Sequence, residues 1–125
     1  MSQIAAVVAS IVLAALAVFQ LALIAGAPIG RFAWGGQHTV LPAKLRIGSV
    51  VSIVLYALFA IVLLDRARVI DVLPDIVSTV GTWVLVGYFA LGIVLNGISR
   101  SKPERNTFAP VSLVLAVLCL MVALA

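Results

Sequence analysis

The chain has 125 residues, of which 65% are hydrophobic and only 10% are charged, and its net charge is +4. Soluble domains are about half apolar and a quarter charged, and the core of so small a domain cannot bury this many apolar side chains. The composition therefore excludes a soluble monomer and a disordered chain, and it predicts a membrane protein. The single cysteine, Cys119, excludes an internal disulfide, and the single histidine, His38, excludes a haem held by two histidines of one chain.

Four apolar segments follow one another along the chain, at about residues 4–25, 47–64, 76–98 and 108–125. Each is close to the roughly 20 residues that an α-helix needs to cross the hydrocarbon core. None of the segments contains a charged residue or a histidine, and only helices satisfy the backbone of such segments in lipid. We therefore predict one transmembrane domain over residues 1–125, an all-α bundle of four antiparallel helices.

Residues next to these segments predict where the helices start and stop. Gly26 follows the first segment, as glycine commonly follows a helix, and Pro42 suits the first turn of the second helix. Asp71 is predicted to cap the third helix and Thr107 the fourth. Because no basic residue precedes the first segment, we interpret it as a permanent span and not as a signal peptide.

The first connection, residues 26–46, is longer than the 2 to 8 residues or so that usually join two packed helices. It contains four of the nine glycines, one of the two tryptophans, the only histidine and three cations. We expect a loop of fixed shape at the membrane surface, with Phe32 and Trp34 among the headgroups. Its candidate residues for binding a ligand or lipid headgroups are Arg31, Trp34, Gly35, Gly36, Gln37, His38, Lys44 and Arg46.

Several interpretations of this loop stand side by side. The backbone amides of Gly35 and Gly36, with the neighbouring cations, are suited to an anion. His38 is a candidate proton acceptor, and the whole loop is a candidate docking surface. The favoured interpretation is simpler: the cations bind lipid phosphates, and Trp34 sets the depth of the chain in the membrane.

The third segment carries a stripe of polar and small residues. Tyr88, Gly92, Asn96 and Ser99 are spaced four, four and three apart and therefore share one helix face. Gln20, in the first segment, is expected at about the depth of Asn96, and an amide pair between them would contribute about 0.6 to 2 kcal/mol. We favour hydrogen bonding between helices as the role of this stripe, with a polar cavity open to the cytoplasm as the alternative.

The distribution of lysine and arginine predicts an orientation. The first and third connections contain six of these residues and the second contains two, together with three of the four acids. By the positive-inside rule, loops 26–46 and 99–107 are cytoplasmic and both termini lie outside the cell membrane, that is, the inner or plasma membrane. The positive charge is thus interpreted as a topology signal and predicts anionic lipid headgroups as partners, with no nucleic acid.

Five short motifs are spread over most of the chain: Gly26-Ala27-Pro28-x-Gly30, Trp34-Gly35-Gly36, Leu41-Pro42-x-x-x-Arg46, Gly87-Tyr88-x-x-Leu91 and Asn96-x-x-Ser99-x-Ser101-Lys102. Together they resemble a set of small bacterial integral membrane proteins with four spans. That resemblance implies the fold and a bacterial source but no activity. Small multidrug transporters match poorly because their embedded glutamate in the first helix is missing, and fluoride channels because their opening Gly-Arg signature and their Phe- and Asn-rich pore helices do not appear.

No ionisable residue lies inside a predicted span, which argues against a proton- or ion-coupled pump. The sequence favours a non-enzymatic membrane protein that acts by binding, as a homo-oligomer or as an accessory subunit of a membrane complex, with no catalytic residues, metal or cofactor. The alternative is a small transporter or pore for a neutral or anionic solute, lined by the polar stripe. An enzyme with His38 as base is the least favoured hypothesis, because no nearby residue is placed to orient it.

Overall fold

The computed structural model describes all residues 1–125 and contains helices but no strands. Each of its four long helices is long and apolar enough to cross a membrane. This confirms the predicted four-helix membrane bundle, and the chain is a multi-pass membrane protein. The long helices are α1 (Ser2–Ile24), α2 (Ala43–Arg66), α3 (Asp75–Gly97) and α4 (Lys102–Leu124), and two short 3-10 helices, η1 (Gly30–Phe32) and η2 (Trp34–Gly36), lie between α1 and α2.

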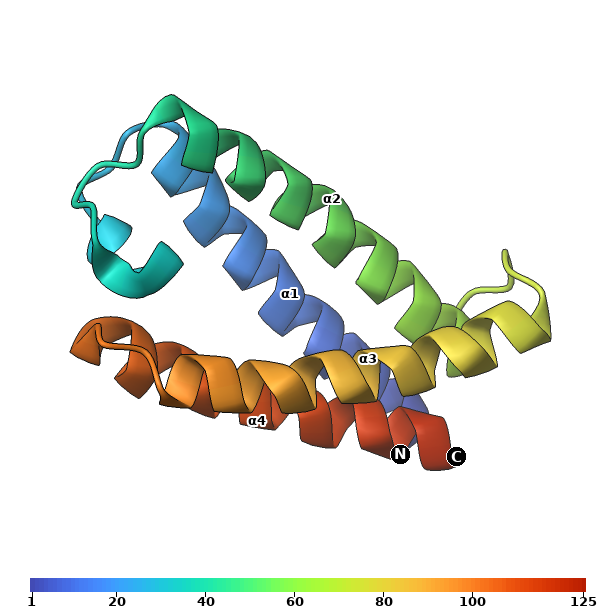
Figure 1. Ribbon diagram of the computed structural model, residues 1–125. Helices are drawn as coiled ribbons and strands as arrows, with labels where there is room; N and C mark the ends of the chain where they lie inside the picture. Colours follow the sequence, from blue (N-terminus) through green and yellow to red (C-terminus); the bar gives the residue numbers. More distant parts are fainter.

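The four helices are arranged as two hairpins, α1 with α2 and α3 with α4 (Figure 1). The short connection between α3 and α4 favours side-by-side packing of these helices in opposite directions. The most extensive contacts in the molecule are those within each hairpin. The two hairpins converge at the end where both chain termini lie. They diverge at the end where η1 and η2 lie, so the bundle is open on that side.

The buried core lies in the converging half. Ala5, Ala6 and Ala9 on α1 are almost completely buried, and such small residues let helices in a membrane approach closely. The remaining buried members of this core are Leu13, Leu63, Ala67, Leu85, Phe89, Leu115, Cys119 and Val122. Because these residues come from all four helices, the core fixes the two hairpins to each other at one end only.

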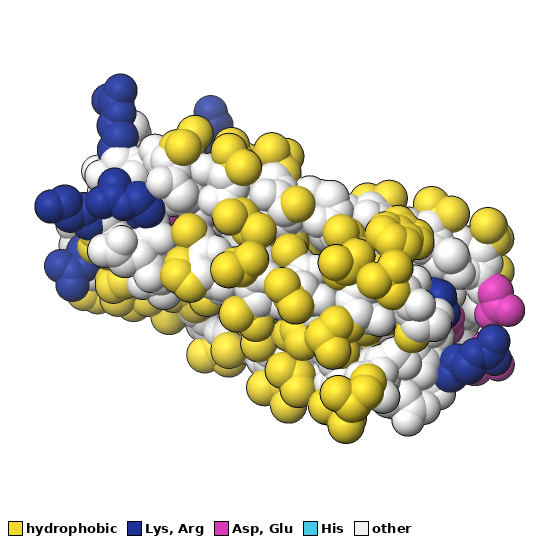
Figure 2. All heavy atoms as spheres, turned by 90° about the horizontal axis from the view of Figure 1, so that it is seen from below, with side chains coloured by type: hydrophobic (Ala, Val, Ile, Leu, Met, Phe, Trp, Pro, Cys, Tyr) yellow, Lys and Arg dark blue, Asp and Glu magenta, His cyan; other side chains and the backbone are white.

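The outer surface is apolar between two charged ends (Figure 2). Only 21 of the 125 residues are buried, and large exposed apolar side chains occur on all four long helices. A soluble protein rarely exposes such a continuous apolar surface, whereas lipid tails match it. Lysine and arginine gather at one end in Figure 2, and side chains of both signs occupy the other.

The predicted end of α1 is confirmed and the predicted start of α3 is wrong. Gly26 follows α1 with φ +91°, and its N–H donates to the Leu23 carbonyl at 3.1 Å. The third helix begins at Asp75, directly after Pro74, without a side-chain cap, while Asp71 is exposed in the connection. Proline favours this arrangement because its ring fixes φ and its nitrogen has no hydrogen to leave unpaired.

The predicted start of α4 is also wrong, because the helix begins before Thr107, at Lys102. Ser101 is the capping residue, and its Oγ accepts a hydrogen bond from the Glu104 backbone N–H at 3.4 Å. Serine followed three positions later by glutamate is a common helix-start pattern. The helix therefore starts among charged residues and extends beyond the apolar segment that defined it in the sequence.

Candidate functional site

A cavity of about 420 Å³ lies between the diverging halves of the two hairpins. All four long helices and the first connection contribute to its walls, which are mainly apolar. Its volume falls in the range of about 300 to 1,000 Å³ that is typical of small-molecule sites. The polar side chains of the lining are Gln20, Ser52, Tyr56, Tyr88, Asn96 and Ser112, and its only charged one is Glu104.

Asn96 is hydrogen-bonded within its own hairpin. Its Nδ2 donates to the Gly92 carbonyl at 2.9 Å and to the Ser112 Oγ at 3.1 Å. The expected amide pair with Gln20 is wrong, because Gln20 Oε1 has no partner at all. Gly92 explains the difference: a Cβ there would lie 3.1 Å from Ser112 Oγ, so α3 and α4 are in close contact while α1 diverges from α3.

Gln20 lies on the α1 wall of the cavity. Its side chain is only 8% exposed, and Oε1 accepts no hydrogen bond. The nearest polar groups belong to α2, where the Tyr56 hydroxyl lies close to Gln20 and to Ser52. The Ser52 Oγ donates to the Gly48 carbonyl at 3.0 Å. The polar face of the first hairpin is thus less completely hydrogen-bonded than that of the second.

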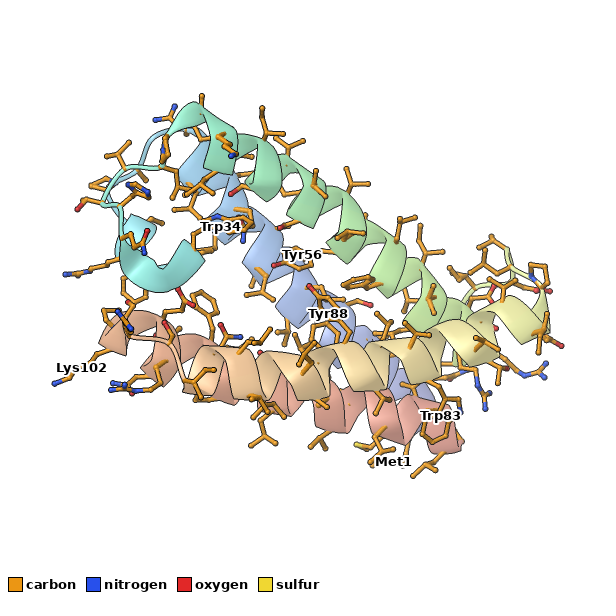
Figure 3. All side chains as sticks on the ribbon, in the orientation of Figure 1. Met1, Trp34, Tyr56, Trp83, Tyr88 and Lys102 are labelled. Carbon is orange, nitrogen blue, oxygen red and sulfur yellow. The ribbon has the colours of Figure 1, made fainter.

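Aromatic rings form the inner wall of the cavity. The Tyr88 ring lies 5.2 Å from that of Phe59 and 5.1 Å from that of Phe89, measured between centroids. Edge-on rings at such distances attract each other, which fixes the orientation of Tyr88. Figure 3 shows Tyr88, Tyr56 and Trp34 in the space between the two hairpins.

The structure places Tyr88, Gly92 and Asn96 of the predicted stripe around one cavity together with Gln20. Ser99 is not part of this lining. Its Oγ accepts a hydrogen bond from the Ser101 backbone N–H at 3.2 Å and so shapes the connection between α3 and α4.

The first connection covers the open end of the cavity. Phe32, Ala33 and Trp34 all belong to the lining, although the aromatic pair was expected among lipid headgroups. The Trp34 indole packs on Gly48 of α2, where an added Cβ would lie 2.9 Å from the ring. Trp34 has φ +53°, a conformation that is uncommon outside glycine and that often marks functional segments.

Hydrogen bonds join this connection to the start of α4. The Gly35 N–H donates to Glu104 Oε2 at 2.9 Å, and the Ser101 hydroxyl donates to the Arg31 carbonyl. Gly36 lies against Ser101 so closely that a Cβ would be 2.4 Å from the serine Cβ. The Gly35 amide that the sequence suggested for an external anion is therefore occupied by a carboxylate of the same chain.

The other candidates of the first connection do not line the cavity. Arg31 stacks over the Phe32 ring at 5.4 Å, and Arg46 Nε donates to the Leu41 carbonyl at 2.8 Å. The side chains that are exposed and lie outside the lining are Gln37, His38 and Lys44.

Four polar or charged cavity residues were not among the sequence candidates. Ser52 and Tyr56 are four apart, so they share a helix face, and that spacing was a usable signal. Glu104 was detectable through the capping pattern that it forms with Ser101. Ser112 had no local signal, because only the packing of α4 against α3 brings it to Asn96.

Apolar walls with a few polar groups are typical of small-molecule sites, in which the walls provide affinity and the polar groups set orientation. Comparison of the chain with protein-family models, with curated proteins and with solved structures finds no match in any of the three. The cavity itself is thus the basis for a functional proposal.

Proposed function

We propose that this chain is a non-enzymatic membrane protein that binds a small, mainly apolar, uncharged molecule between its two hairpins. The observation that carries this proposal is the cavity of about 420 Å³ in the open half of the bundle, with its apolar walls and neutral polar groups. No lysine, arginine or histidine belongs to its lining. An anionic solute would therefore lose its hydration without gaining a countercharge, which favours an uncharged ligand.

Tryptophan fluorescence tests the proposal, because the two tryptophans lie far apart (Figure 3). In the Trp83→Phe protein, the remaining Trp34 at the cavity should be quenched saturably by 1-naphthol. In the Trp34→Phe protein, Trp83 should show only the linear quenching that partition into the membrane produces. Linear quenching of both would contradict the proposal.

A pair of variants on α1 localises the binding. Leu16 lines the cavity, so Leu16→Phe should fill part of it and weaken 1-naphthol binding at least severalfold. Val18 is 65% exposed on the outer surface, and Val18→Phe should leave the affinity unchanged. Equal effects of the two variants would place the ligand outside the cavity.

Transport of a neutral solute is the second candidate function, supported by the position of the cavity in the half of the bundle where the two hairpins diverge (Figure 1). A carrier that exposes its site to one side at a time requires such an asymmetric state. Asn96→Leu removes the amide from the cavity wall and should slow glycerol flux into proteoliposomes severalfold. Flux equal to that of protein-free liposomes would exclude glycerol transport.

Contact with a second copy or with a larger complex is the other form of binding expected from the sequence. The exposed apolar side chains are spread over all four long helices and do not select one face for such contact. Crosslinking in native membranes tests it: a ladder of oligomers supports self-association, and a strictly monomeric band contradicts it.

We further propose that the end of the bundle with the first and third connections is cytoplasmic, in the inner or plasma membrane, with both termini outside. The exposed cations Arg31, Lys44, Arg100 and Lys102 would then meet anionic headgroups. Single cysteines in a Cys119→Ala background test this. An impermeant maleimide should label the Arg68→Cys protein in intact cells. It should label the Lys44→Cys and Lys102→Cys proteins only after the cells are lysed.

A further inference from the structure

We infer that the cavity selects an uncharged apolar molecule that carries a hydroxyl group, and that Gln20 is the residue that recognises this hydroxyl. This inference rests on the proposed function and adds the chemical class of the ligand. It starts from a buried carboxamide that lines the cavity and has an oxygen without a hydrogen-bond partner.

Gln20 differs from its polar neighbours in the cavity. Asn96 and Ser112 are hydrogen-bonded to each other, and Ser52 is bonded to its own helix. Gln20 is 8% exposed, and its Oε1 accepts nothing. Buried polar groups in native proteins almost always have a partner, because an unpaired one loses its hydration without compensation.

The missing partner of Gln20 Oε1 comes neither from α2, where the Tyr56 hydroxyl lies close to Gln20 without bonding to Oε1, nor from the opposite wall. Gln20 lies near the end of α1, in the half where the two hairpins diverge. Asn96 of α3, the polar group expected to meet it, is turned to Ser112 instead. A molecule bound in the cavity is therefore placed to supply the hydrogen bond.

A hydroxyl group fits the carboxamide of Gln20 better than a neutral group that only accepts hydrogen bonds. It donates to an amide oxygen and also accepts from an amide N–H. A ketone or an ether only accepts, and so leaves Oε1 unpaired. An anionic group is disfavoured, because the one charged side chain in the lining, Glu104, is itself negative.

The body of the ligand is constrained by aromatic walls. Tyr56, Tyr88 and Phe89 line one part of the cavity, and the tilted pair Phe19 and Phe108, 5.1 Å between centroids, lines another. Such faces favour flat apolar molecules over globular ones. An aromatic alcohol such as 1-naphthol therefore represents the proposed class.

The test compares 1-naphthol with 1-methylnaphthalene, in which a methyl group of similar size replaces the hydroxyl. The two dissociation constants are measured for the Trp83→Phe protein in nanodiscs, with and without the further change Gln20→Met. The preference for 1-naphthol is the dissociation constant of 1-methylnaphthalene divided by that of 1-naphthol. This ratio should be about fivefold to tenfold greater in the protein that retains Gln20 than in the Gln20→Met protein, which is the effect of one hydrogen bond. Comparing the ratios of the two constants cancels the different partition of the probes into lipid.

Gln3→Met is the matched control, because Gln3 lies on the same helix but is exposed. It should leave the ratio unchanged. If the ratio in the Gln20→Met protein is unchanged, the inference is overturned. If both probes still bind saturably in that case, the proposed function stands. Absence of saturable binding in the protein that retains Gln20 overturns both.

A second measurement needs no change at Gln20, in case the Gln20→Met protein fails to fold. This measurement uses 1-methoxynaphthalene, which accepts but does not donate a hydrogen bond. The Trp83→Phe protein should bind it severalfold more weakly than 1-naphthol, after both affinities are corrected for partition into protein-free discs. Equal corrected affinities would contradict recognition of a hydroxyl donor.

Discussion

At the scale of single residues, Asp65 shows how one buried carboxylate shapes a connection. It lies in the last turn of α2, is only 5% exposed, and accepts hydrogen bonds from the backbone N–H groups of Val72 and Leu73 at 2.7 and 2.8 Å. Hydrogen bonds to an ionised acceptor are stronger than those between neutral groups. The segment that leads into α3 is therefore held against the end of α2.

Replacing Asp65 with alanine should lower the free energy of unfolding measurably, because two backbone donors lose a charged acceptor. Unfolding in mixed micelles measures the change. Asp71→Ala is the control, since Asp71 is exposed in the same connection, and it should have little effect. Equal destabilisation by both variants would show that the two hydrogen bonds are not the cause.

Gly30 is a second residue whose identity is fixed by its surroundings. Its N–H donates to the Thr39 carbonyl at 2.7 Å, and a Cβ would lie 2.1 Å from the His38 carbonyl oxygen. No larger residue fits between these segments without moving the backbone. The close contact closes the first connection on itself.

Gly30→Ala should therefore open the first connection and destabilise the protein by about 1 to 3 kcal/mol, the usual effect of overpacking. Limited proteolysis should cut within residues 26–46 faster than in the unmodified protein. Gly87 on α3 has nothing within 4 Å of an added Cβ, and Gly87→Ala should leave the cleavage rate unchanged. Slow cleavage of the Gly30→Ala protein would contradict this explanation.

At the scale of elements, the first connection closes the gap between the two hairpins and is more than a link from α1 to α2. It contacts α2 through Trp34 on Gly48, and it contacts α4 through Gly35 and Glu104. The two hairpins are thus joined by the core at one end and by this connection at the other. The connection also forms part of the cavity wall, through Phe32, Ala33 and Trp34.

Glu104→Ala should loosen this contact, because it removes the acceptor of the Gly35 N–H. Hydrogen exchange at Gly35 should then become about tenfold faster, as expected for the loss of one hydrogen bond of about 1.4 kcal/mol. Hydrogen exchange followed by mass spectrometry of a peptide covering the loop measures this. Lys102→Ala, at an exposed neighbouring residue of α4, should leave exchange unchanged. An unchanged rate in Glu104→Ala would mean that other contacts hold the loop closed.

At the scale of the whole molecule, tight packing and empty space are separated along the bundle axis. The core of alanines and larger apolar residues fills the end near the termini, and the cavity lies at the opposite end. Without a hydrophobic force between helices in lipid, close packing supplies most of the attraction. The converging half should therefore carry most of the stability, and the diverging half is free to bind a ligand.

Two leucines on α2 test this division of roles. Leu63 is fully buried in the core, and Leu63→Ala should cost about 2 to 4 kcal/mol through the cavity it leaves. Leu58 is 51% exposed on the same helix, and Leu58→Ala should cost less than about 1 kcal/mol. Similar losses in reversible unfolding would show that stability is not concentrated in the converging half.

The sequence by itself determined the class of structure. Four apolar segments without charges were enough to predict four spanning helices, because the bilayer requires long apolar helices with internally paired backbones. Local signals also placed the end of α1 at Gly26. They failed at Asp71 and Thr107, because proline in one case and the Ser101 and Glu104 pair in the other decided where the helix begins.

Only the tertiary structure decided how the polar residues are partnered. The stripe on α3 was visible from its spacing, but whether Asn96 bonds to Gln20 or to Ser112 depends on how far apart the helices lie. Gly92 brings α4 close to α3, while α1 diverges, so Asn96 is paired and Gln20 is not. The hydrophobic pattern is a property of the sequence and can be read from it. A cavity depends on the distances between helices, and these distances are set by the packing of all four helices together.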